Sequence, residues 1–537
     1  MKGNRSNYIK KLILPCLGLS AVAGIVTGAV IFLFKIAANA VIELSDELYA
    51  LVRANPAYLP LLCIGAALIG LFAAVILRWE PSCRGGGIPT SIAILRGLIT
   101  FRWLRSLIAT FISAIMTYFG GIPLGTEGPS VQMGTLLGRG TVRTLAKNNL
   151  AWDRYIMTGG ACAGFACATG APLTGILFAF EEAHRRFSPM IFMTAATAVF
   201  SGYAISKHLC ELADIAPGLF DLSNHVFEMP LRYLWVPLAV GIIAGLIGAA
   251  LAWLYRSLKA GIERIRLSIF FKIPVIFALT ALIGFASSKL IGTGHSLIDL
   301  LLEEHGIWYL SILILAVRAI LLIVSTNAGI TGGLFIPSLA FGALIGSIAA
   351  EILIKLGLLP SAHYLLIVTV GMASFLAAFS RTPLMAIAFS FELLGGTANL
   401  LPIILSVSFA YTTIETVGIP SFVETIIEGK EETQNRGKKA TVVNARITVM
   451  PRAFAVGKEI RDILWPPTCT VLSVTKNPEF TDRNDGALHP GDILHVHYRT
   501  FDPTESKALF ESIVGVQPQA PDARTHAAGE NYEVPQL

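Results

Sequence analysis

Gly125-Thr126-Glu127-Gly128-Pro129 places one carboxylate between glycines and a proline, inside an otherwise uncharged and apolar part of the chain. An ionisable side chain at membrane depth costs about 3 kcal/mol or more on insertion scales, so it marks an ion or proton pathway. The glycines and the proline are typical of the start of a helix, where unpaired backbone N–H groups can hold an anion. A titratable group beside an anion site predicts coupled transport of anions and protons.

The composition around this stretch is that of a membrane protein. Of 537 residues, 54% are hydrophobic and only 14% are charged, whereas about a quarter of a soluble protein is charged. Basic residues precede an apolar run over residues 12–40, which predicts a first membrane helix and a cytoplasmic N-terminus. The net charge of +6 fits attraction to anionic lipid, and we expect no nucleic-acid partner. The seven cysteines form no C-x-x-C pair, so we expect neither disulfides nor a metal site.

Glycines and prolines interrupt the apolar segments, which predicts broken or partial helices lining a cavity. We expect a membrane domain over residues 1–427, a charged linker over 428–439, a small cytoplasmic α+β domain over 440–515 and a disordered tail over 516–537. The predicted fold class is therefore an all-α polytopic membrane protein with an appended α+β domain.

The membrane domain contains an internal repeat. Four positions recur 208 residues later: Gly125, Pro129, Gly134 and Gly138 match Gly333, Pro337, Gly342 and Gly346. A second block recurs with a shift of 211 and pairs Gly160, Pro172 and Glu181 with Gly371, Pro383 and Glu392. Two halves, about residues 12–215 and 230–420, with broken helices are typical of transporters whose site lies where the repeats meet. We expect the halves to be related by an inverted repeat.

The repeat also separates structural carboxylates from functional ones. Glu181 has a counterpart in Glu392 and is expected to serve the fold as a helix-end or interhelical partner. Glu182 is replaced by Leu393 in the second half, and Glu127 by Phe335. Glu127 and Glu182 are therefore the candidates for function.

Four motifs in order resemble those of the CLC family of chloride channels and chloride/proton exchangers over residues 12–427. They are Gly85-Gly86-Gly87-Ile88-Pro89, Gly125-Thr126-Glu127-Gly128-Pro129, Ala171-Pro172-Leu173-Thr174-Gly175 with Phe180-Glu181-Glu182, and Gly333-Leu334-Phe335-Ile336-Pro337. The resemblance implies a homodimeric, multi-pass protein of the plasma membrane, with both termini cytoplasmic and one anion pathway per subunit. It implies chloride and protons as the transported ions, membrane lipid as surroundings, no cofactor and no enzymatic activity.

The resemblance also assigns roles to residues. Backbone N–H groups of Ile88, Leu334 and Phe335 would line the chloride site. Glu127 would be the gate and external proton glutamate, occupying an anion position when charged and leaving it on protonation. Glu182 would receive protons from the cytoplasmic side. Exchangers of the family generally keep both glutamates, whereas channels usually lack the second.

Two positions depart from the family pattern. Gly86 stands where a serine hydroxyl donates to the central anion, and Phe422 where a tyrosine supplies the other side-chain donor. Each lost donor to an anion weakens binding by about 1.5–3 kcal/mol unless water replaces it. We therefore expect broader anion selectivity and a wider inner gate.

Residues 440–515 resemble the C-terminal domain of potassium-uptake regulators (TrkA-C), with segments over 445–449 and 470–474, a helix near 458–464, and a Pro-Gly-Asp turn at 490–492 before a final strand that reaches Val496. The paired cystathionine-β-synthase domains of other family members are not apparent in this sequence. The resemblance to TrkA-C implies a domain that pairs with a second copy of itself, and some TrkA-C domains bind small ligands such as cyclic di-AMP. The alternative is a module that stabilises the dimer without a ligand. His495 and His497 alternate on a strand and are expected on its exposed face.

Four other functions remain open at this stage. A passive chloride channel is favoured if the missing hydroxyls open the inner gate. A fluoride/proton antiporter is disfavoured, because such relatives usually lack the second glutamate and carry Asn or Met at the position of Gly86. A membrane-anchored ligand sensor would not need the anion motifs, and an intramembrane enzyme would need a nucleophile–base pair that the apolar sequence does not offer.

Overall fold

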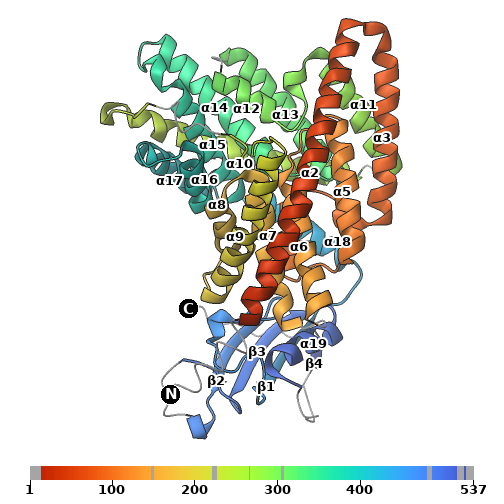
Figure 1. Cartoon of the computed structure of the whole chain (residues 1–537), viewed down its shortest axis with the longest axis vertical. Coiled ribbons are helices and arrows are strands. Elements are labelled where there is room, and N and C mark those ends of the chain that lie inside the picture. The colour runs from red at the N-terminus through yellow and green to blue at the C-terminus, as the bar shows by residue number, and fades with distance from the viewer. Residues whose placement is uncertain are drawn as a thin grey trace.

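The computed structural model describes residues 14–146, 150–220, 227–264, 267–303, 307–480, 486–516 and 525–527. The chain forms a large helical body with a small sheet-containing domain at one end (Figure 1). Among the described residues, nine helices are long and apolar enough to cross a membrane. The predicted class, an all-α polytopic membrane protein with an α+β domain, is confirmed.

In the described residues of its first half, the membrane domain contains eight α-helices. They are α2 (Leu14–Ala54), α3 (Leu59–Trp79), α4 (Gly87–Leu95), α5 (Trp103–Phe119), α6 (Glu127–Leu145), α7 (Leu150–Thr169), α8 (Pro172–Phe178) and α9 (Pro189–Leu212). A π-helical turn, Ala179–Ala183, continues α8. Helices α4 and α8, with 9 and 7 residues, are too short to cross a bilayer, which agrees with the predicted broken helices.

In their described residues, the second half and its C-terminal extension contain nine α-helices. They are α10 (Trp235–Arg264), α11 (Ile269–Ala286), α12 (His295–Glu303), α13 (Trp308–Ala328), α14 (Phe335–Lys355), α15 (Tyr364–Ser380), α16 (Pro383–Leu394), α17 (Leu400–Val417) and α18 (Phe422–Gln434). The linker predicted over residues 428–439 therefore begins inside α18, and the irregular connection covers residues 435–440.

Repeat-related glycines make equivalent helix contacts in the two halves. A Cβ atom on Gly134 of α6 would lie 2.1 Å from the carbonyl oxygen of Gly160 on α7. A Cβ on Gly342 of α14 would lie 2.4 Å from the carbonyl oxygen of Gly371 on α15. Any larger residue would force these helix pairs apart. The predicted repeat is thus visible in how α6 packs on α7 and α14 on α15.

The two halves meet at a glycine junction, formed by Gly125 and Gly333. The N–H of Gly125 donates to the carbonyl of Gly333 at 2.8 Å, and the N–H of Gly333 donates to the carbonyl of Gly125 at 2.6 Å. This bridge is antiparallel. Helices α6 and α14 begin two residues after it, so equivalent segments approach each other in opposite directions, as expected for inverted repeats.

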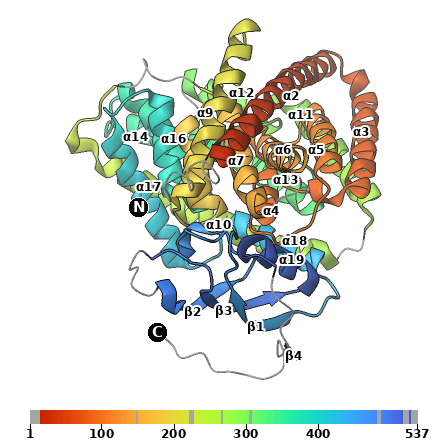
Figure 2. The ribbon, with the colours of Figure 1, turned by 60° about the horizontal axis from the view of Figure 1, so that its bottom comes forward.

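In its described residues, the C-terminal domain is an antiparallel sheet with one α-helix. Strands β1 (Thr441–Thr448), β2 (Thr470–Thr475) and β3 (Ile493–Thr500) are arranged in the order β2-β3-β1, and the short β4 (Thr525–Ala527) pairs with the free edge of β1. Helix α19 (Pro503–Val514) buries Phe510 and Ile513 against Tyr498 and Val496 of β3. His497 lies on the exposed face of β3, as predicted, and His495 on the same face is half-buried. Figure 2 shows this domain beneath the helices.

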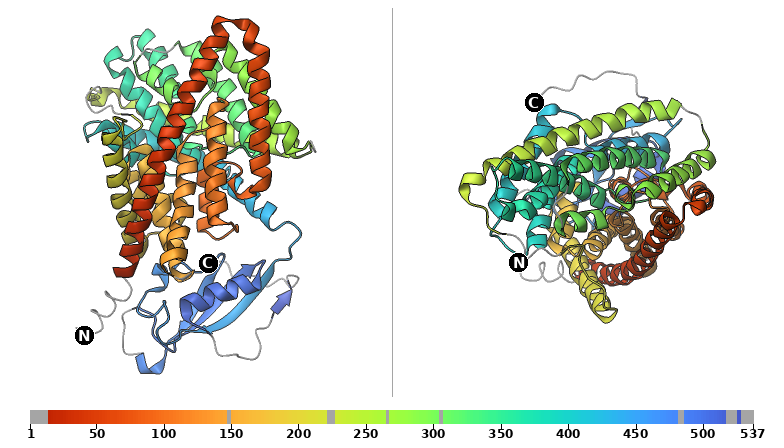
Figure 3. Two further views of the ribbon diagram at one scale, coloured as in Figure 1. Left: turned by 45° about the vertical axis from the view of Figure 1, so that its right-hand side comes forward. Right: turned by 90° about the horizontal axis from the view of Figure 1, so that it is seen from above.

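The C-terminal domain lies against one end of the helices (Figure 3), and residues 454–465 dock on α7. The ring of Phe454 lies 5.1 Å from that of Trp152 and 5.9 Å from that of Tyr155, both on α7. The Tyr155 hydroxyl donates to the carbonyl of Asp462 at 2.6 Å and accepts from the N–H of Leu464 at 2.9 Å. We call residues 454–465 the docking loop.

The helix predicted near residues 458–464 is wrong. The segment forms only a single 3-10 turn, Ile460–Asp462, and the backbone becomes extended at Ile463. The carbonyls of Ile463 and Leu464 accept from the membrane domain, that of Ile463 from Arg186 and that of Leu464 from Arg154, and these bonds hold the segment in its extended course. Of the tail predicted to be disordered, the structure describes residue 516 and the residues of β4.

Candidate functional site: a buried cavity where helix starts meet

A cavity of about 20 Å³ lies inside the membrane domain, and four of the predicted site residues line it. Ile88 comes from the start of α4, Leu334 and Phe335 from the start of α14, and Glu182 from the π turn after α8. A polar space larger than about 10–15 Å³ can hold one water-sized occupant. We call this space the central cavity; it has room for about one ion or water.

Helices α4 and α14 begin at the central cavity and α6 begins beside them, and all three starts present backbone rather than side-chain groups. In the described structure, α4, α6 and α14 begin without a hydrogen bond from a side chain at the capping residue. Each has proline as its third residue, at Pro89, Pro129 and Pro337, which fixes a helical φ and removes one N–H donor. The remaining N–H groups and the positive end of each helix dipole favour an anion.

The wall also contains hydroxyls that sequence analysis did not select. Ser338 stands one turn after the start of α14, and Ser380 and Thr382 flank the end of α15. The Oγ of Ser380 lies 2.6 Å from the Oγ1 of Thr382, and Ser338 donates to the carbonyl of Phe335 at 2.6 Å. The repeat comparison gave no reason to select them, because serine and threonine are common in the apolar segments.

Gly86 and Phe422 occupy positions next to the cavity rather than on its described wall. Gly86 is the capping residue of α4 with φ +25°, a conformation that L-amino acids rarely adopt. A Cβ there would lie 3.3 Å from Pro89 and 3.4 Å from Leu334. Phe422 is buried and stacks at 4.9 Å on Phe379, which does line the cavity.

Glu127 is the first residue of α6 and is completely buried. Its Oε1 accepts from the Thr126 hydroxyl at 2.9 Å, whereas its Oε2 has no hydrogen-bond partner within the described part of the chain. Its neighbours Thr126 and Ile336 border a separate pocket of about 280 Å³ that also includes Lys35 and His295. Glu127 thus stands between this outer pocket and the helix starts of the central cavity.

Glu181 and Glu392 form a reciprocal pair of helix caps between the halves. The Glu181 carboxylate accepts from the N–H groups of Leu384 and Met385 on α16 at 2.8 and 2.7 Å. The Glu392 carboxylate accepts from the N–H groups of Leu173 and Thr174 on α8 at 2.6 and 3.0 Å. These bonds confirm that the shared carboxylate is an interhelical partner, and they leave Glu182 as the acidic side chain on the cavity wall.

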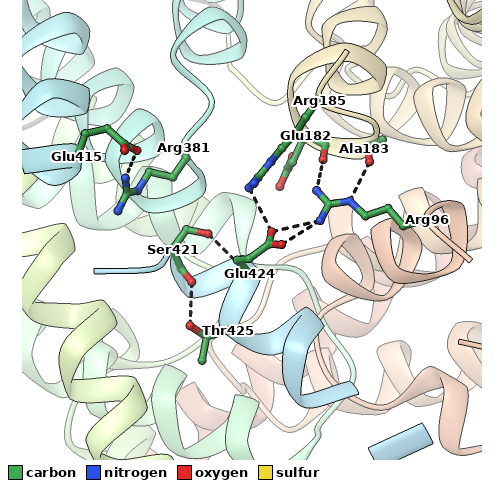
Figure 4. Close-up of polar contacts among 9 residues, drawn as sticks. All are labelled: Arg96, Glu182, Ala183, Arg185, Arg381, Glu415, Ser421, Glu424 and Thr425. Carbon is green, nitrogen blue, oxygen red and sulfur yellow. Dashed lines mark hydrogen bonds and ion pairs between the residues drawn. The ribbon is translucent and has the colours of Figure 1, made fainter. Parts of the chain in front are cut away.

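Arg96 and Glu424, which sequence analysis missed, lie beside the turn that carries Glu182. Arg96 follows α4 and donates to the carbonyls of Glu182 and Ala183, while its guanidinium pairs with Glu424 of α18 at 3.0 Å. Figure 4 shows these contacts together. Glu424 also lines an open vestibule of about 780 Å³ with Glu181 and Arg381.

Comparison with known proteins identifies the family and the fold. The sequence model of the family described as voltage gated chloride channel matches residues 65–415. The H(+)/Cl(-) exchange transporter ClcA of Salmonella gallinarum is 28% identical over 443 residues, covering 80% of this chain and 92% of the relative. That of Salmonella arizonae is 29% identical over 419 residues, covering 75% and 87%.

Solved structures share the fold. A slow cyanobacterial Cl-/H+ antiporter matches with a TM-score of 0.72 at 22% identity, over 78% of this chain and 99% of that one. A CLC-type fluoride/proton antiporter matches with a TM-score of 0.65 at 19% identity, over 76% and 97%.

Proposed function

The chain belongs to the voltage gated chloride channel (CLC) family, and from that premise we propose that it exchanges chloride for protons, with Glu127 as gate and Glu182 as internal proton glutamate. The relatives that it matches over most of their length are named H(+)/Cl(-) exchange transporters. The fold is that of a multi-pass membrane transporter.

One observation carries the proposal: a buried carboxylate shares a one-ion cavity with two uncapped helix starts. Glu182 lines the same 20 Å³ space as Ile88 of α4 and Phe335 of α14. A passive anion pore has no use for an acidic group at this point, since a carboxylate repels the permeant ion. A proton acceptor beside an anion site is what exchange of the two ions requires.

Glu127 supplies the second half of the cycle. Its carboxylate is buried at the start of α6, and one of its oxygens lacks a partner among the described residues. When charged, it competes with chloride for the donors at the helix starts; when protonated, it releases them. Alternation between these two states couples proton binding to anion movement.

Chloride is the proposed substrate anion, and the passive channel and the fluoride/proton antiporter remain the alternatives. Gly86 and Phe422 offer no hydroxyl to the anion. Ser338, Ser380 and Thr382 also line the cavity, but their hydroxyls already bond to the carbonyls of Phe335 and Leu376 and to one another. We therefore propose an anion site held mainly by backbone N–H groups, with broader selectivity than in relatives with serine and tyrosine.

We further propose a homodimer in the plasma membrane, with both termini in the cytoplasm and the C-terminal domain as a TrkA-C-like regulator. A nucleotide such as cyclic di-AMP would bind residues 440–515 at the interface of the paired domains. Direct docking on α7, through Phe454 and Tyr155, gives such a ligand a route to the transport machinery.

Proton flux driven by a chloride gradient in reconstituted vesicles tests the exchange. We expect the wild-type protein to move protons against chloride, Glu127→Ala to keep chloride flux without proton movement, and Glu182→Gln to lose proton movement alone. Repeating the wild-type measurement with fluoride and nitrate ranks the anions. Wild-type chloride flux without any proton movement would leave the passive channel as the function.

A further inference from the structure

The turn that carries Glu182 is held by an arginine from another helix. The Arg96 Nη2 donates to the carbonyl of Glu182 and its Nε to the carbonyl of Ala183, each at 3.1 Å (Figure 4). The last carbonyls of a helix have no internal partner, so a guanidinium there satisfies them and interacts favourably with the helix dipole. Arg96 therefore fixes the backbone from which the Glu182 side chain extends.

The same guanidinium is fixed in turn by Glu424. The Nη1 of Arg96 donates to both oxygens of the Glu424 carboxylate at 3.0 and 3.3 Å, and Arg185 Nη2 donates to one of them at 3.1 Å. About a quarter or less of each of the Arg96 and Glu424 side chains is exposed, so solvent screens the pair only in part. Arg185 follows the turn that carries Glu182, so Glu424 is linked to that turn indirectly through two arginines. We call these three residues the Glu182 brace.

The brace separates the vestibule from the central cavity. Glu424 lines the open vestibule, whereas its neighbour Val423 lines the central cavity together with Glu182. The anion end of α4, at Ile88, is eight residues from Arg96, or about 12 Å along a helix. A displacement of the brace therefore acts first on Glu182 and only weakly on the anion donors.

We propose that Arg96 and Glu424 are positioning residues for proton transfer at Glu182, an inference that rests on the exchange function proposed above. Proton transfer depends steeply on the placement of its groups, and an error of about 1 Å can cost on the order of 100-fold in rate. The proposed chloride donors are backbone N–H groups at the starts of α4 and α14, whereas the brace bonds to the turn that carries Glu182. Loss of the brace thus lowers protons moved per chloride rather than chloride flux.

Glu424 is not needed to begin α18. The cap of that helix is the Ser421 hydroxyl, which accepts from the backbone N–H of Glu424 at 3.1 Å and persists when the side chain changes. A loss of coupling in Glu424 variants is therefore separable from loss of the helix. Glu415 provides a matched control, because it lines the same vestibule and pairs with Arg381 without touching the turn of Glu182.

The test compares Glu424→Ala, Glu424→Gln, Arg96→Lys and Glu415→Gln with wild type in the same vesicles, recording chloride and proton flux together. We expect Glu424→Ala to lower protons per chloride about threefold or more, with chloride flux within about twofold of wild type. Glu424→Gln should have a smaller effect, since its amide oxygen still accepts from Arg96. Arg96→Lys should resemble Glu424→Ala, because one ammonium cannot serve both carbonyls and the carboxylate. Glu415→Gln should match wild type.

The outcomes distinguish the two proposals. Absence of proton movement in the wild type refutes the exchange function itself. Coupled wild-type flux that depends on Glu182, together with wild-type stoichiometry in both Glu424→Ala and Arg96→Lys, overturns the brace. Chloride and proton flux falling in parallel at constant stoichiometry also overturns it, since a merely structural role has that signature. A thermal unfolding midpoint recorded for each variant verifies that folded protein was compared.

Discussion

Replacing Tyr155 of α7 by phenylalanine removes only the hydroxyl group that bonds to the docking loop. That hydroxyl makes two hydrogen bonds to backbone groups of the C-terminal domain, to the carbonyl of Asp462 and from the N–H of Leu464. The ring still packs against Phe454. A buried backbone group without a partner costs about 1–3 kcal/mol. Water that reaches the carbonyl of Asp462 and the N–H of Leu464 lowers the combined cost of leaving both without the hydroxyl. We expect undocking to become easier by about 2 kcal/mol, or roughly 30-fold.

Hydrogen–deuterium exchange on the full-length protein measures this change. Amides of residues 459–465 should exchange roughly 30-fold faster in Tyr155→Phe, while amides of α7 and β3 stay protected. Tyr498→Phe serves as the control, because Tyr498 packs on Phe510 inside the C-terminal domain, away from the docking loop. Equal exchange of residues 459–465 in wild type and Tyr155→Phe would refute the assignment of this hydroxyl as a docking contact.

Four further outcomes follow from the structure. Gly86→Ser should strengthen chloride binding in calorimetry yet lower the unfolding temperature, because φ +25° strains a side-chain-bearing residue by about 1–2 kcal/mol; unchanged affinity would show that residue 86 does not reach the anion. Glu181→Gln should lower thermal stability, because a neutral amide caps α16 less well, but keep the proton-to-chloride ratio; uncoupled transport would move the proton role to Glu181. Burial lowers the pKa of Lys458 to about 7, so the undocked loop binds more protons above that pH and docking should strengthen as pH rises from about 7 toward 10.5; in Lys458→Met, the undocking free energy obtained from exchange rates divided by their intrinsic values should lose that dependence. Truncation after Gln434 should leave the stoichiometry unchanged and alter only the rate; a changed ratio in flux assays would show that the domain takes part in coupling.

Truncation at this point, rather than near residue 428, follows from the course of α18. Lys430 donates to the carbonyl of Arg84 at 2.5 Å and Gln434 to the hydroxyl of Thr100 at 2.7 Å. The change in composition near residue 428 marks where α18 becomes polar, and the helix itself continues to Gln434. Composition reports the surroundings of a helix better than its end.

The sequence predicts features that recur or that have a strict local requirement. Comparison of the two halves separated Glu181, a helix cap, from Glu182, on the cavity wall, and the hydrogen bonds of Glu181 and Glu392 bear out the structural half of that hypothesis. The glycine and proline spacing located the starts of α6 and α14 within one or two residues.

Other features depend on distant partners and leave no local pattern. Arg96 and Glu424 are 328 residues apart, and each looks like an ordinary charge at the edge of an apolar segment. The segment 458–464 has a helical composition, but its carbonyls bind side chains of α7 and of Arg186, which single-sequence reasoning cannot anticipate. Phe422 packs on Phe379 and Tyr255, contacts that fix its ring without any signal in its neighbours.

The glycine junction restricts how this molecule can move during its transport cycle. A Cβ atom on Gly128 would lie 2.5 Å from the Cα of Gly333, and one on Gly87 would lie 1.9 Å from the carbonyl oxygen of Gly128, so three backbones touch at this point. Together with the two hydrogen bonds of the junction, these backbone contacts hold the starts of α4, α6 and α14 against one another. A rocking motion of one half against the other would have to break these contacts and hydrogen bonds in every cycle. For the exchange proposed above, this arrangement favours alternation of access through rotation of side chains, and turnover should then respond more to the size of residues beside the Glu127 carboxylate than to the stiffness of loops at the membrane surface.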